Sequence, residues 1–521
     1  MKKLLLSVMC LAAMWSCNTQ DPENSKVDEG NIYMRLSLKM ETKSGTDEDG
    51  DTNSNADPDY EVGSTSENNV NSVSIALVEK GGKGGYVTAK VTGDKLEEAV
   101  NPANTYIASF ESQQLEPNAT YYVYIYANCD APAAFDADEV RDPATLNTMA
   151  APNNFWMTNA YAANEVTLPS DLSPYTQAHS PFNLGAHSVE RSVARFDFLS
   201  KNDNKFEILK ENDVNATITL TSAAIINQSK NHYMFRRVSD DGSNNGWTVG
   251  GIETPRNYVV DTDYSAKANG YTENIKTNFN AHMTDPTNWS WIQLASLSQN
   301  DNWKGEGEKD HDPSDYKVMA YVKENTIPNI DEQEKGITTG VVFKGQITGN
   351  AIPTGEQKGM IFVFENVLYG NWEAVVTASQ APDAPATLIN AVNKVQNAFG
   401  ETAVTDPTDA ATAKRFSDAG FTGYNPDADG NYYAYYYYWN RHNDNLDNAR
   451  MGNMEFAVVR NNVYKLCVDK IAKFGHPDPK DPKNPDPDPE DPTDPDESLN
   501  YYFNVTVKVL PWVVRVNHIE F

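Results

Sequence analysis

The sequence predicts a mainly β fold divided between two domains. Short runs of alternating apolar and polar residues recur between Gly, Asn and Pro turns, for example "VNSVSIALVEK" (70–80) and "TYYVYIYANC" (120–129). Aromatic residues make up 11% of the chain, and their rings fit pleated, half-buried surfaces. A length of 521 residues is too great for one ordinary hydrophobic core, so we expect two domains.

The chain is strongly acidic. It has 42 Lys and Arg against 73 Asp and Glu, a formal net charge of −31. Nucleic-acid binding needs clustered cations, so this balance excludes nucleic acid as an expected partner. It favours solubility outside the cell.

The N-terminus has the pattern of an export signal. A short basic start precedes an apolar run over residues 4–15, which is too short to anchor a helix across a bilayer. A small residue stands directly before Cys17, as in bacterial lipoprotein signals. We therefore expect residues 1–16 to be a signal peptide and Cys17 to carry a lipid. The alternative is an ordinary signal peptide followed by an unmodified cysteine.

The other three cysteines do not suggest a disulfide scaffold. Cys10 lies in the signal, whereas Cys129 and Cys467 lie far apart in alternating apolar stretches. Two spare cysteines in an exported chain of this length are too few for a disulfide framework. We expect Cys129 and Cys467 to be buried free thiols.

The first strand and the loop after it form an unusual pair. Residues 31–40, "NIYMRLSLKM", alternate strictly, which predicts a half-buried strand. Residues 41–69 are then almost wholly polar and acidic. Loops of this length are usually functional, and exposed ones are where proteases cut. The apolar face of the strand consists of Ile32, Met34, Leu36, Leu38 and Met40.

The strand pattern continues through two expected domains, residues 44–228 and 229–476. The segment 228–247, "QSKNHYMFRRVSDDGSNNGW", suggests the boundary between them. One helix is predicted over residues 385–399. Its apolar face would carry Leu388, Val392 and Val395.

The C-terminus combines a spacer with an apolar tail. Residues 477–498 are rich in Pro and Asp, and eight prolines lie within 477–495. Such a sequence favours an extended polyproline II spacer that spans roughly 60 Å. The pattern of residues 499–521 then predicts a last pair of strands. An apolar tail on a long polar spacer is expected to dock against another surface. Trp512, Val514 and Val516 form its second apolar row, and Ile519 and Phe521 complete the predicted donor strand.

The stretch "NYYAYYYYWNRHNDN" (431–445) raises the question of a ligand platform. Along a strand, however, successive side chains point to opposite faces, so these rings cannot form one exposed surface. We expect a strand with one row in the core and the other under a neighbouring loop or subunit. The rows are Tyr433, Tyr435 and Tyr437 on one face, and Tyr436, Tyr438 and Asn440 on the other.

The sequence contains no catalytic or cofactor-binding motif that we recognise. There is no nucleophile elbow, zinc-protease motif or dinucleotide fingerprint, so neither enzyme activity nor a cofactor is expected. "NPDADG" (425–430) resembles the start of a calcium loop, but Tyr436 stands where the closing Glu belongs. We expect a turn there and no metal. "GGKGG" (81–85) lacks the spacing of a phosphate loop and predicts a hairpin loop.

The two ends of the chain suggest how copies of it could join. If a protease cut the loop after the first strand, that strand could leave an apolar groove with unpaired backbone groups. The tail of a second molecule could fill the groove by β-augmentation. Five apolar side chains would contribute on the order of 10 kcal/mol before backbone hydrogen bonds. Such a head-to-tail contact does not close, so it builds a filament.

Several stretches resemble Bacteroidales fimbrilins of the type V pilus, most of all the major subunits of the Mfa-type short fimbria. They are "YEVGSTSENNVNSVSIAL" (60–77), "VERSVARFDF" (189–198), "AYVKENTI…TTGVVFKGQI" (320–347), "YYYYWNRHNDN…KIAKFGHP" (435–477) and the tail "VKVLPWVVRVNHIEF". The resemblance implies two transthyretin-like β-sandwich domains with a few short helices. It also implies export as an outer-membrane lipoprotein, removal of the first strand and polymerisation by donor-strand exchange through the C-terminal strand.

The resemblance assigns roles at both ends. Residues 17–43 would be a lipidated propeptide that contains the strand 31–40. Related fimbrilins are cut after an Arg, but no Arg lies between Arg35 and Arg141, so Lys43 is the best-placed basic residue for the cut. The partners would be copies of this chain, other fimbrial subunits, the outer membrane before processing, and a host or bacterial surface receptor.

The sequence is compatible with more than one function and with more than one role for the tail. A monomeric surface lipoprotein that binds glycans would use the tyrosine stretch for stacking. Within a fimbria, shaft and accessory positions both fit a chain that has a spare donor strand. Residues 501–510 could complete the chain's own second domain and leave 512–521 as the donor, or both parts could run along the neighbour.

Overall fold

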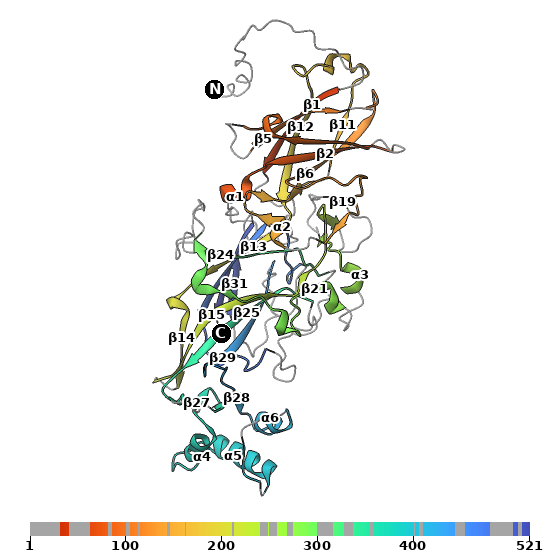
Figure 1. Cartoon of the computed structure of the whole chain (residues 1–521). Helices are drawn as coiled ribbons and strands as arrows, with labels where there is room; N and C mark the ends of the chain where they lie inside the picture. The colour runs from red at the N-terminus through yellow and green to blue at the C-terminus, as the bar shows by residue number, and fades with distance from the viewer. Residues whose placement is uncertain are drawn as a thin grey trace, which may run out of the picture.

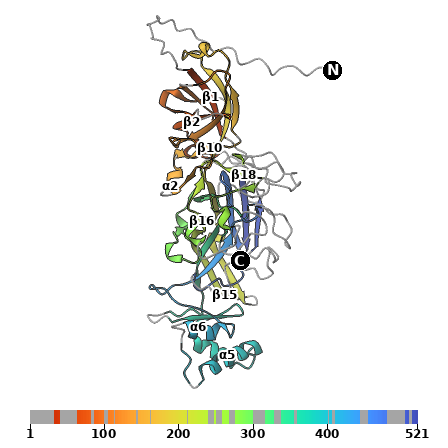
Figure 2. The same cartoon turned by 90° about the vertical axis from the view of Figure 1, so that its right-hand side faces the viewer.

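The computed structural model is mainly β, as predicted, and elongated (Figures 1 and 2). The first sheet lies at one end, two further sheets lie in the middle, and a helical lobe lies at the other end. The structure describes residues 32–40, 63–81, 86–99, 105–112, 115–142, 146–161, 163–210, 213–239, 248–249, 258–267, 275–299, 316–327, 337–354, 359–400, 402–405, 410–442, 454–479, 504–508 and 513–520.

A nine-stranded sheet forms the N-terminal part. Its order is β3-β2-β6-β10-β12-β1-β5-β4, and β11 pairs with β6. The pairing of β1 with β12 is parallel, and the other pairings of this sheet are antiparallel. The β2–β3 pairing confirms the hairpin predicted around residues 81–85. The strands are β1 (Ile32–Met40), β2 (Ser72–Glu79), β3 (Tyr86–Thr92), β4 (Leu96–Glu98), β5 (Thr105–Ser112), β6 (Thr120–Ala127), β10 (Met157–Asn159), β11 (Asn164–Thr167) and β12 (Phe182–Arg191).

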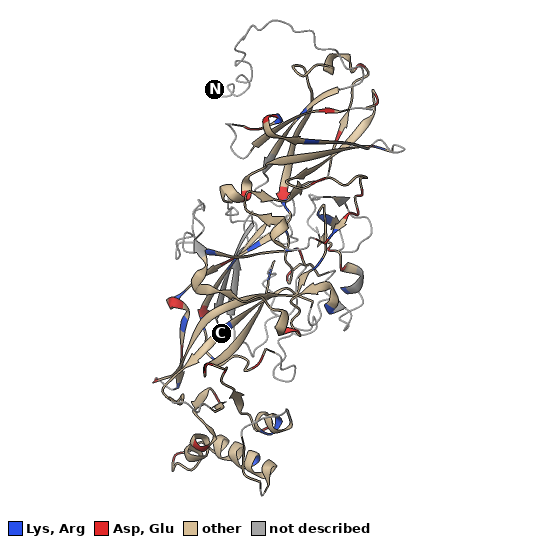
Figure 3. Ribbon diagram, viewed as in Figure 1, with Lys and Arg blue, Asp and Glu red and all other residues tan. Residues whose placement is uncertain are grey.

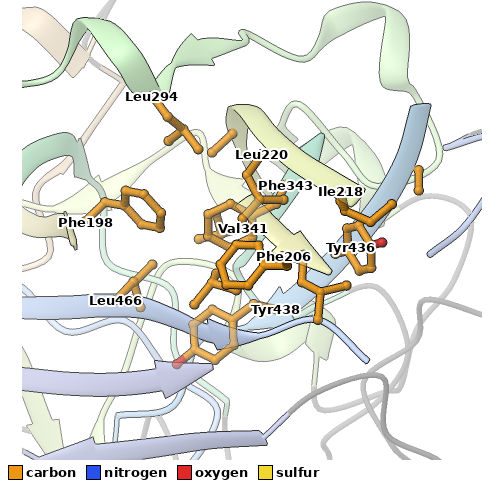
Figure 4. Packing of buried hydrophobic residues seen from close by; sticks show 14 of the residues in the cluster. Phe198, Phe206, Ile218, Leu220, Leu294, Val341, Phe343, Tyr436, Tyr438 and Leu466 are labelled. Atoms are coloured by element: carbon orange, nitrogen blue, oxygen red, sulfur yellow. The ribbon is translucent and has the colours of Figure 1, made fainter. Parts of the chain in front are cut away.

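Two sheets face each other in the middle of the molecule (Figure 4). The first has the order β23-β24-β13-β30-β32-β31. It consists of β13 (Ala194–Leu199), β23 (Ser298–Gln299), β24 (Lys317–Val322), β30 (Asn462–Lys470), β31 (Asn504–Lys508) and β32 (Val513–Glu520). The second has the order β14-β15-β25-β29, with β22 on β15. It consists of β14 (Lys205–Lys210), β15 (Asp213–Ile226), β22 (Ile292–Gln293), β25 (Gly340–Thr348) and β29 (Tyr432–Trp439).

The core between these sheets is built by alternation. Phe198 and Leu466 point inward from the first sheet and belong to the same apolar cluster as Phe343 and Tyr436 of the second (Figure 4). The rings of Phe198 and Phe343 lie 5.6 Å apart between centroids. Each strand buries every second side chain against the opposite sheet, which is how a β-sandwich forms its core.

Short elements connect and flank the sheets. They are α1 (Thr65–Asn68), β7 (Val140–Arg141), α2 (Leu146–Met149), β8 (Ala150–Ala151), β9 (Asn154–Phe155), β16 (Gln228–Ser229), β17 (His232–Tyr233), β18 (Arg237–Ser239), β19 (Thr248–Val249), β20 (Tyr258–Val259), α3 (Tyr264–Lys267) and β21 (Phe279–Asn280). No helix in the described part of the chain is both long enough and apolar enough to cross a bilayer.

The helical lobe has an apolar core of its own. It combines the small sheet β27-β26-β28 with three helices. The predicted helix is confirmed as α5, and its expected apolar residues Leu388, Val392 and Val395 are buried. The elements are β26 (Ile361–Phe364), β27 (Val367–Tyr369), α4 (Trp372–Ser379), α5 (Ala386–Phe399), α6 (Ala410–Ser417) and β28 (Thr422–Tyr424).

The tyrosine stretch is strand β29, as predicted, and its two rows differ in burial. Tyr436 and Tyr438 belong to the core, whereas Tyr433, Tyr435 and Tyr437 are half-buried. The outer row lies under another part of the chain. The main chain of Tyr435 pairs with that of His476, and the Tyr437 hydroxyl donates to the Pro479 carbonyl at 3.4 Å.

Cys129 and Cys467 are buried free thiols, as predicted. Burial is the main cause that raises the pKa of Cys129 to about 12. A thiol with so high a pKa is protonated at neutral pH and is a poor nucleophile. Cys129 therefore acts as a small apolar side chain.

The two largest clusters of buried apolar residues divide the chain between Val193 and Ala194. The described part of the segment 228–247 contacts residues on both sides of this division, and Arg460 donates to the carbonyls of Tyr233 and Met234 at 2.8 and 3.0 Å. His232 and Tyr233 pair with β7, and Arg236 forms an ion pair with Glu190 at 3.0 Å. The domain boundary at 228/229 stays a prediction. In Figure 3 the described Lys and Arg residues are scattered over the sheets and the lobe instead of lining one element.

Candidate assembly site

The strand predicted from residues 31–40 is β1, and it lies in the interior of the N-terminal sheet. It pairs in parallel with β12, from Met34 opposite Phe182 to Met40 opposite Val189, with an irregularity between Arg35 and Ser37. On its other side it pairs antiparallel with β5, in continuous register. β1 is thus the strand that connects β5 to β12.

The apolar face of β1 is part of the core. Met34, Leu36 and Leu38 are each 0% exposed and Ile32 is 7% exposed, whereas Arg35 on the other face is exposed. The four apolar residues pack in one cluster with the inward residues of β2 and β6. The side chain of Met40 lies outside the described residues. The strict alternation of apolar and polar residues in β1 thus places one row of side chains in the core and the other outside it, as predicted.

Loss of β1 would leave a groove with defined chemistry. Its floor would be the apolar cluster, and its walls would be the edges of β5 and β12, each with backbone N–H and C=O groups freed from β1. Such an edge is a template for an incoming strand. β3 also lies close to β5, so the sheet has a contact that does not depend on β1.

The chain resumes after the acidic loop at α1, which is tightly held. Ser64 and Glu67 form a reciprocal cap: Glu67 N–H donates to Ser64 Oγ at 3.3 Å, and Ser64 N–H donates to Glu67 Oε2 at 2.6 Å. The spacing Ser-x-x-Glu is the sequence signature of this capping box. It is the signal from which α1 could have been found in the sequence.

Glu67 is also the centre of a buried ionic network. Its carboxylate is 1% exposed, accepts from Arg195 Nη1 at 2.8 Å and from the Tyr321 hydroxyl at 2.9 Å. Its carbonyl oxygen accepts from Arg191 Nε at 3.1 Å. Burial alone would raise the pKa of Glu67, but the charges of Arg195 and Arg191 hold that pKa at about 2.

This network joins the two main cores. Arg191 ends β12 in the first, whereas Arg195 lies near the start of β13 and Tyr321 lies on β24 in the second. Asp197 completes it, with Oδ2 accepting from Arg195 Nη2 at 2.7 Å. A cut in the loop before residue 63 would leave α1 and this network in place, so β1 is the described element on the other side of such a cut.

At the other end of the chain, β32 lies inside a sheet with the same kind of neighbours as β1. It pairs in parallel with β30, from Asn462 opposite Val513 onward, and antiparallel with β31. Val514, Val516 and Ile519 of the predicted donor strand belong to β32. Trp512 and Phe521 lie outside the described residues, as do Cys17 and Lys43.

The calcium-like motif forms a turn. Asp427 Oδ1 accepts from the main-chain N–H groups of Asn431 at 2.8 Å and Asp429 at 3.0 Å. The main-chain hydrogen bond from Asn431 is the largest cause that lowers the pKa of Asp427. Among the described residues, no group of three or more His, Cys, Asp or Glu side chains is arranged to hold a metal ion.

Comparison with known families gives one match. Residues 431–518 match the C-terminal family model described as major fimbrial subunit protein type IV, fimbrillin. The matched region runs from β29 through β30 to β32. This match confirms the resemblance to fimbrial subunits that the sequence predicts.

Solved structures give weak likenesses. A fimbrial assembly protein from Parabacteroides distasonis shares 10% identity over 61% of this chain and 96% of its own, with a TM-score of 0.26. The tip fimbrial protein Mfa3 from Porphyromonas gingivalis shares 10% over 63% of this chain and 83% of its own, with a TM-score of 0.27. A comparison with curated proteins finds no match.

Proposed function

We propose that this chain is a structural subunit, in a shaft or accessory position, of a cell-surface fimbria that polymerises by donor-strand exchange. The observation that carries the proposal is the place of β1. An N-terminal strand lies between β5 and β12 with its apolar row in the core, and it precedes a long acidic loop. The fimbrillin match over residues 431–518 supports the same class of protein. The role is structural and not catalytic.

The proposed precursor is an outer-membrane lipoprotein. A lipid on Cys17 would hold it at the membrane, and a protease would cut after Lys43 to release β1 with the propeptide 17–43. The buried Glu67 network supports this order of events, because it would keep α1 in place after the cut. Sequencing the N-terminus of the surface polymer tests the site. A mature start well before Leu36 or well past Thr46 would contradict Lys43.

The proposed donor is the strand 512–521 of the next subunit. Taking the place of β1, it would pair with β5 and β12 and rest its apolar row on the exposed core. The spacer 477–498 is long enough to carry it away from its own sheet. Filaments of this kind would present the subunit to host or bacterial surfaces and support adhesion and biofilm formation.

Deletion of residues 512–521 tests the proposal directly. The processed wild-type chain should give a ladder of polymers on a denaturing gel run without boiling, and the deletion should abolish it. A matched chain that lacks residues 499–508 shows whether the β31 segment belongs to the donor or to the subunit itself. Ladders that persist after the first deletion would show that the donor assignment is wrong.

A monomeric glycan-binding lipoprotein remains the competing function. It would be favoured if the processed full-length chain never formed ladders. The outer aromatic row offers it little support, since these rings already contact other groups. Tyr435 lies 6.0 Å from Trp291, Tyr437 lies 5.4 Å from His476, and Lys344 Nζ lies 3.9 Å above the Tyr433 ring.

A further inference from the structure

Lys267, the last residue of α3, is completely buried. It is 0% exposed, and the residues whose oxygens accept from its Nζ, Asp261, Asn325 and Thr326, are 3%, 1% and 2% exposed. Its Nζ lies 2.5 Å from Asn325 Oδ1 and also donates to Asp261 Oδ2. The ring of Phe279 lies 5.6 Å from the same nitrogen. A buried lysine is expected to have a charged partner, but this one also touches a carboxamide.

Hydrogen bonds with the surrounding chain hold Lys267, Asp261 and Asn325 in place. The main-chain N–H of Lys267 donates to the Asp263 carbonyl at 3.0 Å. Asn325 exchanges two main-chain hydrogen bonds with Val458, of 2.9 and 2.8 Å. Asp261 Oδ2 accepts from the Thr326 N–H at 2.8 Å, and its Oδ1 accepts from the Asp263 N–H at 3.0 Å. The carboxamide nitrogen of Asn325 is held by Asn227 O, Ile337 O and Thr339 Oγ1. An amine, an amide carbon and a carboxylate are therefore fixed together before any reaction, which greatly increases their effective concentration.

We propose that Lys267 and Asn325 form an intramolecular isopeptide bond, with Asp261 as the proton carrier. The Lys267 ammonium gives one proton to the Asp261 carboxylate, and the freed lone pair on Nζ attacks Asn325 Cγ. The carbonyl electrons move onto Oδ1 as the Nζ–Cγ bond forms. Asp261 then carries protons to Nδ2, the carbonyl re-forms, and the Cγ–Nδ2 bond breaks.

The reaction balances without a further reactant. A lysine ammonium and a carboxamide become a secondary amide and an ammonium ion, and Asp261 ends as the carboxylate that it was at the start. No oxidant, reductant or cofactor takes part. The buried site favours this outcome because water that could compete for the tetrahedral carbon is excluded.

The chemistry distinguishes this site from the buried arginine ion pairs around the two cores. Arg195 and Arg460 pair with Glu67 and Glu324, but a guanidinium keeps its proton and does not act as a nucleophile. The Lys267–Asn325 bond would tie the turn after β20 to the segment after β24, across 58 positions of sequence. It would brace the second sandwich covalently, and it does not depend on fimbrial assembly.

Mass spectrometry of the purified full-length chain tests the bond. Proteolysis should yield a branched peptide that contains both Lys267 and Asn325 and weighs one ammonia less than its two linear parts together. Trypsin should also fail to cut after Lys267. The variants Lys267→Arg and Asp261→Asn should give only linear peptides. Lys465→Arg, which changes a buried lysine outside this cluster, should keep the branch.

The wild-type chain decides the matter even if a variant fails to fold. Linear peptides alone, recovered from folded wild-type protein, would overturn the proposal and leave a buried ion pair. A branch that survives in Asp261→Asn would overturn the role given to Asp261. Loss of ammonia without a branch would point to succinimide formation at an asparagine, and it would also overturn the proposal.

Discussion

The two strands at the ends of the chain, β1 and β32, have matching neighbours and different sequence patterns. Each pairs in parallel with one strand, β12 or β30, and antiparallel with another, β5 or β31. The apolar row of β1 is unbroken, whereas the tail keeps its row only to Val516. Ile519 stands three positions further, and in a regular strand that places it on the opposite face.

This difference suggests which part of the tail would fill a groove. An unbroken row matches one fixed apolar floor, and in β1 it meets the core cluster of the first sheet. The tail has such a row only in its first half, Trp512 to Val516. We expect that half to take the place of the buried residues of β1, and Ile519 with Phe521 to contact something else.

The two strands also differ in how they are attached. β1 is followed, after the acidic loop, by α1, which the Glu67 network anchors between the two cores. β32 follows a Pro/Asp-rich spacer instead. β1 is therefore separated by a loop from an anchored helix, as expected for a strand that is removed. β32 lies at the end of a long spacer, as expected for a strand that is donated.

The largest expected effect is that of a charge in β1. Leu36→Asp places a carboxylate among the apolar side chains of the core of the uncut chain and should lower the free energy of unfolding by about 4 kcal/mol or more. Denaturant unfolding of the uncut chain measures it. Arg35→Asp, on the exposed face of the same strand, is the matched control and should change little. Equal effects of the two substitutions would show that β1 is not held as described.

A smaller effect concerns the anchor at Glu67. The pKa of the Glu67 carboxyl is lowered from its ordinary value of 4.5 to about 2. The ionised carboxylate therefore contributes fully to the free energy of unfolding above pH 4.5, and this contribution is lost as the pH falls towards 2. That contribution is about 3 kcal/mol. Glu67→Gln should lose it at neutral pH and should show a flatter decline of stability in acid.

The measurement is urea unfolding of both chains at a series of pH values. Glu165→Gln is the control, because Glu165 pairs with Lys80 on the surface and should contribute nothing measurable. Parallel acid profiles for wild type and Glu67→Gln would contradict the role of Glu67.

The smallest effect on folding is expected in the tail. Val516→Asp should change the free energy of unfolding of the monomer by about 1 kcal/mol or less, because the strand is proposed to leave its own sheet. The same substitution should remove the polymer ladder. Asn517→Asp, one position along, should keep the ladder. A monomer destabilised as strongly as by Leu36→Asp would show that β32 belongs permanently to its own sheet.

Much of the architecture follows from local patterns. Alternation predicted the buried row of β1 and the two rows of the tyrosine strand, and helical periodicity predicted the buried face of α5. The buried free thiols Cys129 and Cys467 also followed from their apolar surroundings. These predictions succeed because each depends on only one element and one periodicity.

Other features depend on residues far apart in the sequence. Arg195 and Glu67 are separated by 128 positions, and Lys267 meets Asn325 across 58. In so acidic a chain, carboxylates stand near basic residues everywhere, so no pair can be chosen from the sequence. The Ser64–Glu67 capping spacing could have located α1, but nothing local shows that its carboxylate lies between two cores.

Local patterns in the sequence are enough to predict the apolar face of β1, the two rows of β29, the buried face of α5 and a Pro/Asp-rich spacer before the last strands. They do not show that β1 lies between β5 and β12, that β32 pairs with β30, or that Glu67 joins the two cores, which depend on the folded chain. The physical reason is that alternation selects the face of a strand but not its neighbours. Neighbours are selected by the summed packing and hydrogen bonding of the whole sheet, to which distant segments contribute.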